Sequence, residues 1–156
     1  VLRTGNKPLA AATLLLDGAK GATAVLLAAQ YGPDLALAAG MAAVIGHVAP
    51  IWLLFRGGKG VATSLGVLLA VDWRLGLIAC AVWLATAAVF RYSSLAALIA
   101  LVSAPGFSHL LAGRQLTELT ALLAAIVIVK HSANICRLLS GREPRIGAGK
   151  DKSASG

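Results

Sequence analysis

The stretch that decides the fold is Gly46–Pro50, with the sequence GHVAP, followed closely by Phe55–Thr63, with the sequence FRGGKGVAT. It places a glycine-rich loop carrying Lys59 directly after a long apolar segment. Glycines let a backbone come close to a ligand, and the N–H groups of such a loop, with a lysine and the start of a helix, can bind phosphate. Because the surroundings are apolar enough for a bilayer, the stretch predicts a phosphate site at a membrane surface and chemistry on a lipid or lipid precursor.

The composition indicates a membrane protein. The chain has 156 residues, of which 58% are hydrophobic and 13% are charged, and its mean hydropathy is +0.83. Soluble domains carry about 25% charged residues, and the aliphatic stretches here are too many and too long to share one small soluble core. We therefore expect an all-α, polytopic bundle of transmembrane helices over residues 1–140 and a flexible basic tail over residues 141–156.

Charged residues divide the chain into six apolar segments. Most of these segments approach the roughly 20 residues that a helix needs to cross a bilayer. The third is too short for an upright crossing, so we expect a half-helix or a short crossing at a protein-lined site. The six segments are residues 8–30, 35–55, 61–71, 75–90, 93–112 and 116–130.

The basic residues are distributed unevenly between the two ends of these segments. If residues 1–7, 56–60, 91–92 and the tail from Lys130 share one side, that side holds nearly all the Lys and Arg residues, and the other holds only Arg74 and Arg114. The positive-inside rule then places the first group in the cytoplasm. Anchoring to anionic membrane lipid accounts for most of the formal charge of +8, so no nucleic-acid partner is expected.

Several phosphate-binding side chains would meet at this cytoplasmic surface. Arg3 opens the chain, Lys59 lies in the glycine loop, and His131 and Asn134 follow the last apolar segment. Asn134 is three residues from His131 and three from Arg137, so on a helix each pair would be neighbours. Singly, each has a plain structural interpretation, as a membrane-edge anchor or a helix cap. Together they predict a site.

No metal or other cofactor is expected. Cys80 and Cys136 lie in different segments and fit neither a disulfide nor a metal site. Asp17 and Lys20 are charged residues inside an apolar segment, and their i, i+3 spacing allows an ion pair that offsets part of the cost of charge in a membrane. Two interpretations of this pair remain open: a structural pair, or residues that line the site.

Several motifs together resemble the bacterial acyl-phosphate-dependent glycerol-3-phosphate acyltransferases, the PlsY family. The matching stretches are residues 2–5, 17–21, 46–50, 55–63, 92–95, 131–138 and 141–144, so the resemblance covers essentially the whole chain. The FxGGKGVAT and HxxNIxRL elements are quite specific. The family has one more N-terminal helix and a glycine-rich stretch before the Leu2-Arg3 motif. The six segments would therefore correspond to six of the family's seven transmembrane helices, and we expect this chain to be an incomplete member.

The resemblance implies a bacterial inner-membrane enzyme that transfers an acyl group from acyl phosphate to the 1-hydroxyl of glycerol 3-phosphate. The products would be lysophosphatidic acid and orthophosphate, in phospholipid synthesis. No serine, cysteine or carboxylate nucleophile is obvious, so direct transfer is expected, with catalysis by positioning and charge stabilisation. The candidate catalytic residues are His131 and Asn134. The candidate phosphate-binding residues are Arg3, Gly57, Gly58, Lys59 and Gly60, and the possible site-lining residues are His47, Thr63 and Arg137.

Two other classes of protein remain open at this stage. A small transporter would carry charged residues near the midplane on discontinuous helices in repeated halves. Here only Asp17 and Lys20 are internal, and the sequence shows no repeat. A non-catalytic membrane subunit is the other alternative, but it would not need the glycine–lysine loop.

Overall fold

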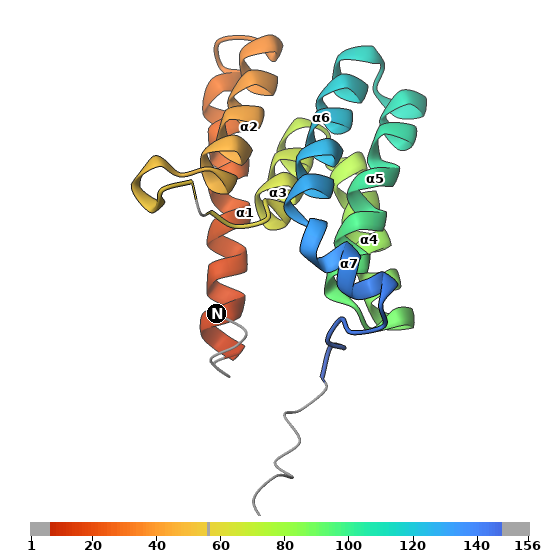
Figure 1. Ribbon diagram of the computed structural model, residues 1–156. Coiled ribbons are helices and arrows are strands. Elements are labelled where there is room, and N and C mark those ends of the chain that lie inside the picture. The colour runs from red at the N-terminus through yellow and green to blue at the C-terminus, as the bar shows by residue number, and fades with distance from the viewer. Residues whose placement is uncertain (1–6, 56, 148–156) are drawn as a thin grey trace, which may run out of the picture.

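The computed structural model describes residues 7–55 and 57–147, and these ranges form helices and loops without a strand. The all-α expectation is therefore confirmed. The helices, in chain order (Figure 1), are α1 (Lys7–Ala29), α2 (Pro33–Val48), the 3-10 helix η2 (Ile51–Leu53), α3 (Val61–Val71), α4 (Trp73–Phe90), α5 (Ser93–Leu111), α6 (Arg114–Lys130) and α7 (Ser132–Leu139).

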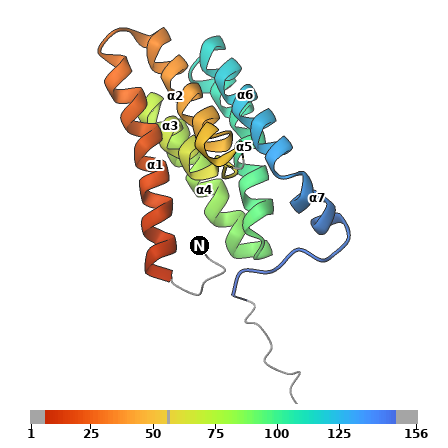
Figure 2. The ribbon, with the colours of Figure 1, turned by 60° about the vertical axis from the view of Figure 1, so that its left-hand side comes forward.

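The short helix α3 joins two groups of helices. It packs against α1 and α2 on one side and against α4 on the other, while α4, α5 and α6 pack in sequence (Figure 2). Small residues bring α1 and α3 together, because a β-carbon on Gly66 would overlap the Gly18 carbonyl, and one on Gly21 would lie 2.5 Å from the Thr63 carbonyl. Close backbone approach at small residues is a common way for membrane helices to associate. It fixes the start of α3, and with it the end of the glycine loop.

The lengths and compositions of the helices fit a membrane bundle. Residues 8–29 of α1, together with α4 and α5, are long and apolar enough to cross a membrane. Helices α6 and α7 pass the same test only as a pair bent by 65°, and α2 and α3 are shorter apolar helices. Large apolar side chains such as Leu16, Leu84 and Leu110 are 62–79% exposed, which suits a surface that faces lipid tails.

Two element boundaries differ from the sequence prediction. The predicted segment 35–55 is helical only to Val48, because Pro50 disfavours the helical conformation at the residue before it and lacks an N–H group. The chain then turns through η2, and Leu54 and Phe55 adopt left-handed backbone angles. Beyond the last predicted segment, the chain bends at His131 and forms α7, which the apolar pattern alone did not delimit.

The two ends of the bundle differ in composition. In Figure 1 the start of α1, the α4–α5 junction and α7 lie at the lower end, and the α1–α2 and α5–α6 junctions lie at the upper end. The lower end carries Arg91, Arg137, Arg142 and Arg145. At the upper end Arg114 pairs with Glu118 at 2.7 Å. This arrangement agrees with the predicted grouping of residues 91–92 with the segment that follows Lys130.

Candidate active site

Lys59 and Asn134 meet although 75 residues separate them in the chain. The Lys59 ammonium donates a hydrogen bond of 2.5 Å to Asn134 Oδ1. Lys59 comes from the glycine loop, and Asn134 lies in the first turn of α7 and is only 5% exposed, so the contact between them is partly buried. The structure thus brings together one predicted phosphate-binding residue and one predicted catalytic residue.

Glu143, which was not predicted as a site residue, fixes the position of Asn134 by hydrogen bonding. Its Oε1 accepts hydrogen bonds of 2.6 Å from Asn134 Nδ2 and from Ser94 Oγ, and its Oε2 accepts one of 2.7 Å from Arg137 Nε. Its side chain is 6% exposed. Because the Asn134 amide donates to Glu143, its oxygen is the atom left to face Lys59. The sequence signals for this role were its place in the matching stretch 141–144 and its being a lone glutamate among basic residues.

The two charged groups of this network have shifted pKa values. Burial lowers the pKa of the Lys59 ammonium; the charge of Glu143 opposes that shift and the charge of Arg137 adds to it. Burial alone would raise the pKa of Glu143, but hydrogen bonds from Ser94, Asn134 and Arg137 outweigh it and lower the pKa. Glu143 is therefore ionised at neutral pH, and Lys59 is a cation that an incoming anion would stabilise.

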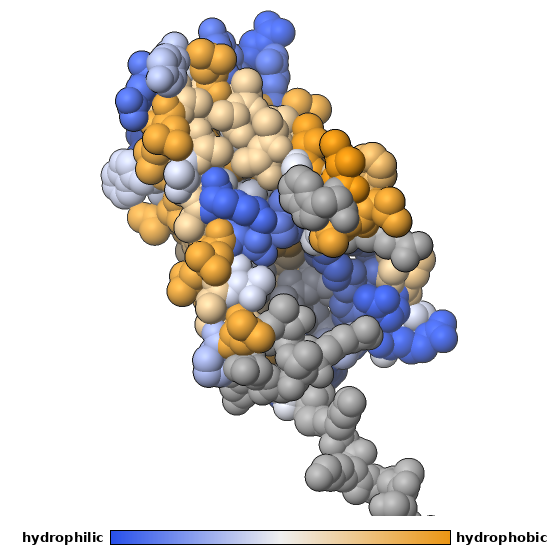
Figure 3. Space-filling model, turned by 90° about the vertical axis from the view of Figure 1, so that its left-hand side faces the viewer, coloured by the Kyte–Doolittle hydropathy of each residue, from blue (hydrophilic) through white to orange (hydrophobic). Residues whose placement is uncertain are grey.

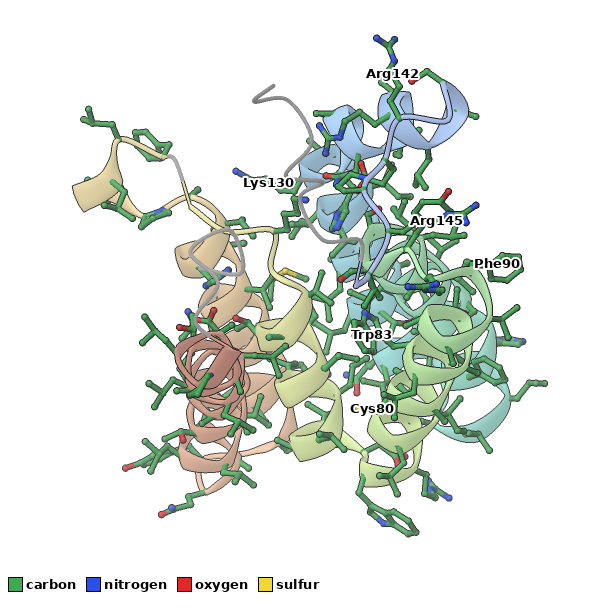
Figure 4. The ribbon with its side chains drawn as sticks, turned by 90° about the horizontal axis from the view of Figure 1, so that it is seen from below. Cys80, Trp83, Phe90, Lys130, Arg142 and Arg145 are labelled. Atoms are coloured by element: carbon green, nitrogen blue, oxygen red, sulfur yellow. The ribbon has the colours of Figure 1, made fainter. Side chains whose placement is uncertain are left out.

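His131 occupies the bend between α6 and α7. It is 2% exposed, and its Nδ1 lies 2.8 Å from the Val127 carbonyl oxygen. A carbonyl only accepts hydrogen bonds, so Nδ1 carries the proton, and Nε2 is the acceptor nitrogen of the neutral ring. The neighbouring Lys130 donates a hydrogen bond of 2.6 Å to the Val48 carbonyl, which ties the end of α6 to the end of α2 (Figure 4).

The glycine loop is shaped by the end of α2. A β-carbon on Gly57 would overlap the His47 carbonyl oxygen, and one on Gly58 would overlap Nε2 of the His47 ring. Gly60 has a left-handed φ of 81° and precedes α3. The Gly58 N–H, predicted to bind phosphate, donates to the His47 carbonyl at 3.2 Å. In this structure Gly58 thus contributes close packing, and its amide already has a protein partner.

The other predicted residues lie at different distances from this network. Arg137 belongs to it through Glu143. Thr63 is fully buried in α3, and its hydroxyl has no hydrogen-bond partner among the described residues. His47 lies behind the loop. Arg3 lies outside the described residues.

Part of the predicted tail is held against the bundle. Arg145 stacks over the Tyr92 ring at 5.6 Å and donates to its hydroxyl at 3.1 Å. The Ile146 N–H donates to the Arg91 carbonyl. Arg142 and Arg145 lie away from the space between the two helix groups (Figure 4). Residues 148–156, which complete the predicted flexible tail, lie outside the described residues.

Comparison with known proteins identifies the family. The model of the family described as glycerol-3-phosphate acyltransferase matches residues 1–141. A glycerol-3-phosphate acyltransferase of Mesorhizobium japonicum is 55% identical over 148 residues, which are 95% of this chain and 76% of that protein. One of Paramagnetospirillum magneticum is also 55% identical, over 99% of this chain and 77% of that protein.

Solved structures agree with this match. The crystal structure of PlsY, an integral membrane glycerol 3-phosphate acyltransferase, in its glycerol 3-phosphate form superposes with a TM-score of 0.88 at 37% identity. The match covers 93% of this chain and 74% of that one. The lysophosphatidic acid form gives a TM-score of 0.87 at 37% identity, covering 93% and 76%.

The helical bundle and its cationic site thus define an integral membrane enzyme of the acyltransferase class. The chain belongs to the glycerol-3-phosphate acyltransferase family, and it spans about three quarters of the length of the relatives it matches.

Proposed function

We propose that this chain transfers an acyl group from acyl phosphate to the 1-hydroxyl of glycerol 3-phosphate, giving lysophosphatidic acid and orthophosphate. The observation that carries the proposal is the contact between Lys59 and Asn134, which unites the two most specific motif elements in one cationic site. The solved relative described in glycerol 3-phosphate and lysophosphatidic acid forms supports the acceptor and the product. This family membership favours an acyltransferase over the transporter and the non-catalytic subunit considered above.

In this proposal both phosphate-bearing substrates bind beside the glycine loop. Lys59 acts as a compact cation for a phosphate group, and the close-packed glycines let the phosphate approach the backbone. Gly57, Gly58 and Gly60 form the wall of that site, with the Gly58 N–H held by the His47 carbonyl oxygen. Arg3 is proposed as a second phosphate-binding residue, with Arg137 supporting the site through Glu143.

The reaction we propose is a single displacement. The 1-hydroxyl oxygen attacks the acyl carbonyl carbon, a new C–O ester bond forms, and the bond to phosphate breaks with its electron pair leaving on phosphate. The hydroxyl proton passes to His131 Nε2, or to the departing phosphate itself. Asn134 orients a phosphate or the hydroxyl by hydrogen bonding. Positioning and charge stabilisation supply most of the rate enhancement.

The proposed location is the bacterial inner membrane, with the glycine loop, α7 and the C-terminus on the cytoplasmic side. The cluster of Arg91, Arg137, Arg142 and Arg145 at one end supports this orientation. The acyl chain would lie against the apolar helices, where it needs no water-filled pocket. We take the acyltransferase domain, predicted at residues 1–140, to include the Glu143 segment, because Glu143 holds Asn134.

Reconstitution of the full-length protein in lipid tests this proposal. Orthophosphate release should require both acyl phosphate and glycerol 3-phosphate, and it should persist in excess chelator because Lys and Arg neutralise the phosphates. Acyl-CoA should not replace acyl phosphate. Turnover with acyl-CoA alone would reject the proposed donor, and activity that chelator abolishes and divalent metal restores would reject the metal-free site.

A further inference from the structure

A group of three titratable residues lies behind the glycine loop. Asp17 and Lys20 come from the middle of α1, and His47 comes from the last turn of α2. The Lys20 ammonium lies 2.5 Å from Asp17 Oδ1 and 2.5 Å from His47 Nδ1, and His47 Nδ1 lies 3.4 Å from Asp17 Oδ1. Figure 3 shows a hydrophilic patch within the largely apolar face that these helices form.

His47 Nδ1 faces both members of the ion pair. In the neutral ring it accepts from the Lys20 ammonium at 2.5 Å, which is closer than the Asp17 oxygen at 3.4 Å. Nε2 is the atom that a β-carbon on Gly58 would overlap. The imidazole therefore lies between the ion pair and the glycine loop, with one edge held by Lys20 and the other against Gly58.

Pairing the charges of Asp17 and Lys20 in the membrane does not require the contact between Lys20 and His47. The i, i+3 contact between Asp17 and Lys20 already pairs the two charges. The contact to His47 adds a connection from α1 to the residue whose carbonyl accepts the Gly58 N–H and whose ring packs on Gly58. Gly58 immediately precedes Lys59, so the connection ends at the proposed phosphate-binding side chain.

We propose that Asp17 and Lys20 are positioning residues for the acyl transfer. Lys20, oriented by Asp17, holds the His47 ring in place; the ring and the His47 carbonyl hold the Gly57–Gly58 backbone; and this backbone places Lys59 opposite Asn134. Neither Asp17 nor Lys20 touches substrate. The inference rests on the proposed role of Lys59 in binding substrate phosphate.

The test uses a variant that removes the connection without leaving an unpaired charge, Asp17→Asn with Lys20→Met, in the full-length reconstituted protein. We expect near-wild-type yield and melting temperature, and a roughly tenfold loss of kcat/KM, equivalent to about 1.4 kcal/mol. If Lys59→Ala lowers kcat, the loss should appear in kcat, and if Lys59→Ala raises KM, it should appear in KM. The single variant Lys20→Arg, which keeps a charged donor beside Asp17, should retain most of the wild-type activity.

A double-mutant cycle separates this inference from the proposed function. If the pair acts through Lys59, adding Asp17→Asn and Lys20→Met to Lys59→Ala should cause no further loss. A fully additive loss, or unchanged kinetics of the neutral variant, would overturn the positioning role and leave the role of Lys59 intact. Near-wild-type activity of Lys59→Ala would reject both.

The matched control neutralises the exposed Arg114–Glu118 pair at the upper end of the bundle. Arg114→Met with Glu118→Gln also removes one cation and one carboxylate from a single helix, but it lies away from the loop. It should leave kcat/KM unchanged. An equal loss in this control would attribute the effect to general loss of charge pairs and overturn the inference.

Discussion

The two halves of the candidate site are held in place by different means. The glycine loop is shaped by backbone packing, with Gly57 and Gly58 pressed against His47 where no β-carbon fits. The α7 half is shaped by side-chain hydrogen bonds that converge on Glu143. One half should therefore be sensitive to an added atom and the other to a removed carboxylate.

Removing the Glu143 carboxylate should have the largest effect. Glu143→Ala leaves Arg137, Asn134 and Ser94 without their acceptor in a nearly buried position. Leaving the buried donors of Asn134 and Ser94 without an acceptor costs about 1–3 kcal/mol each, while Arg137 is half-exposed and can be solvated, so we expect a large drop in melting temperature in detergent and loss of activity. Glu143→Gln should lose less, because an amide oxygen can still accept. A melting temperature within a degree or two of wild type for Glu143→Ala would contradict the role of this carboxylate.

Adding one carbon to the loop should have the next largest effect. Gly57→Ala would force a β-carbon into the His47 carbonyl and to within 2.5 Å of Pro50 Cδ. Overpacking of this kind costs about 1–3 kcal/mol, and here the loop must shift, so kcat/KM should fall more than melting temperature.

Gly46, in the last turn of α2, offers a matched control. A β-carbon there would meet no atom within 4 Å. Gly46→Ala should be neutral, or stabilising by up to about 1 kcal/mol, because alanine favours a helix over glycine. Equal losses of activity in Gly46→Ala and Gly57→Ala would show that close packing does not set the loop apart.

A smaller effect should appear in the pH dependence of stability. Hydrogen bonds lower the pKa of Glu143 in the folded state from the reference value of 4.5, so the unfolded state binds its proton first as pH falls. The stabilisation is fully present above about pH 4.5 and is lost as pH falls through the lower folded-state pKa. Melting temperature should therefore decline on acidification, and Glu143→Gln should flatten that decline. Parallel curves for the two proteins would contradict this assignment.

The sequence predicted much of the fold because its main signals are local. The short apolar run at residues 61–71 coincides with α3, and the i, i+3 spacing of Asp17 and Lys20 allowed the ion pair that is seen at 2.5 Å. The predicted end of the second apolar segment was wrong, because the hydropathy continues to residue 55 whereas Pro50 ends the helix.

The interior of the candidate site could be predicted only in part. Lys59 and Asn134 were both named as site residues, but their direct contact depends on packing between α3 and the later helices. Glu143 was missed because it lies beyond the end of α7 and its partners are 6, 9 and 49 residues away, whereas spacing rules cover only neighbours on one helix. The connection from Lys20 to His47, across 27 residues, likewise needs the tertiary structure.

The most direct test of the account is the specific activity of Lys59→Ala, measured per folded molecule of the full-length protein. Losing a charged partner of a phosphate in a partly buried site costs on the order of 1.5–3 kcal/mol, so we predict a roughly ten- to hundred-fold loss. Lys59→Arg should also be impaired, because the glycine-walled site suits a compact ammonium better than a planar guanidinium. The exposed Arg114→Ala should behave like wild type. Wild-type specific activity for Lys59→Ala would contradict the account, and Lys59 would then be only a membrane-edge anchor.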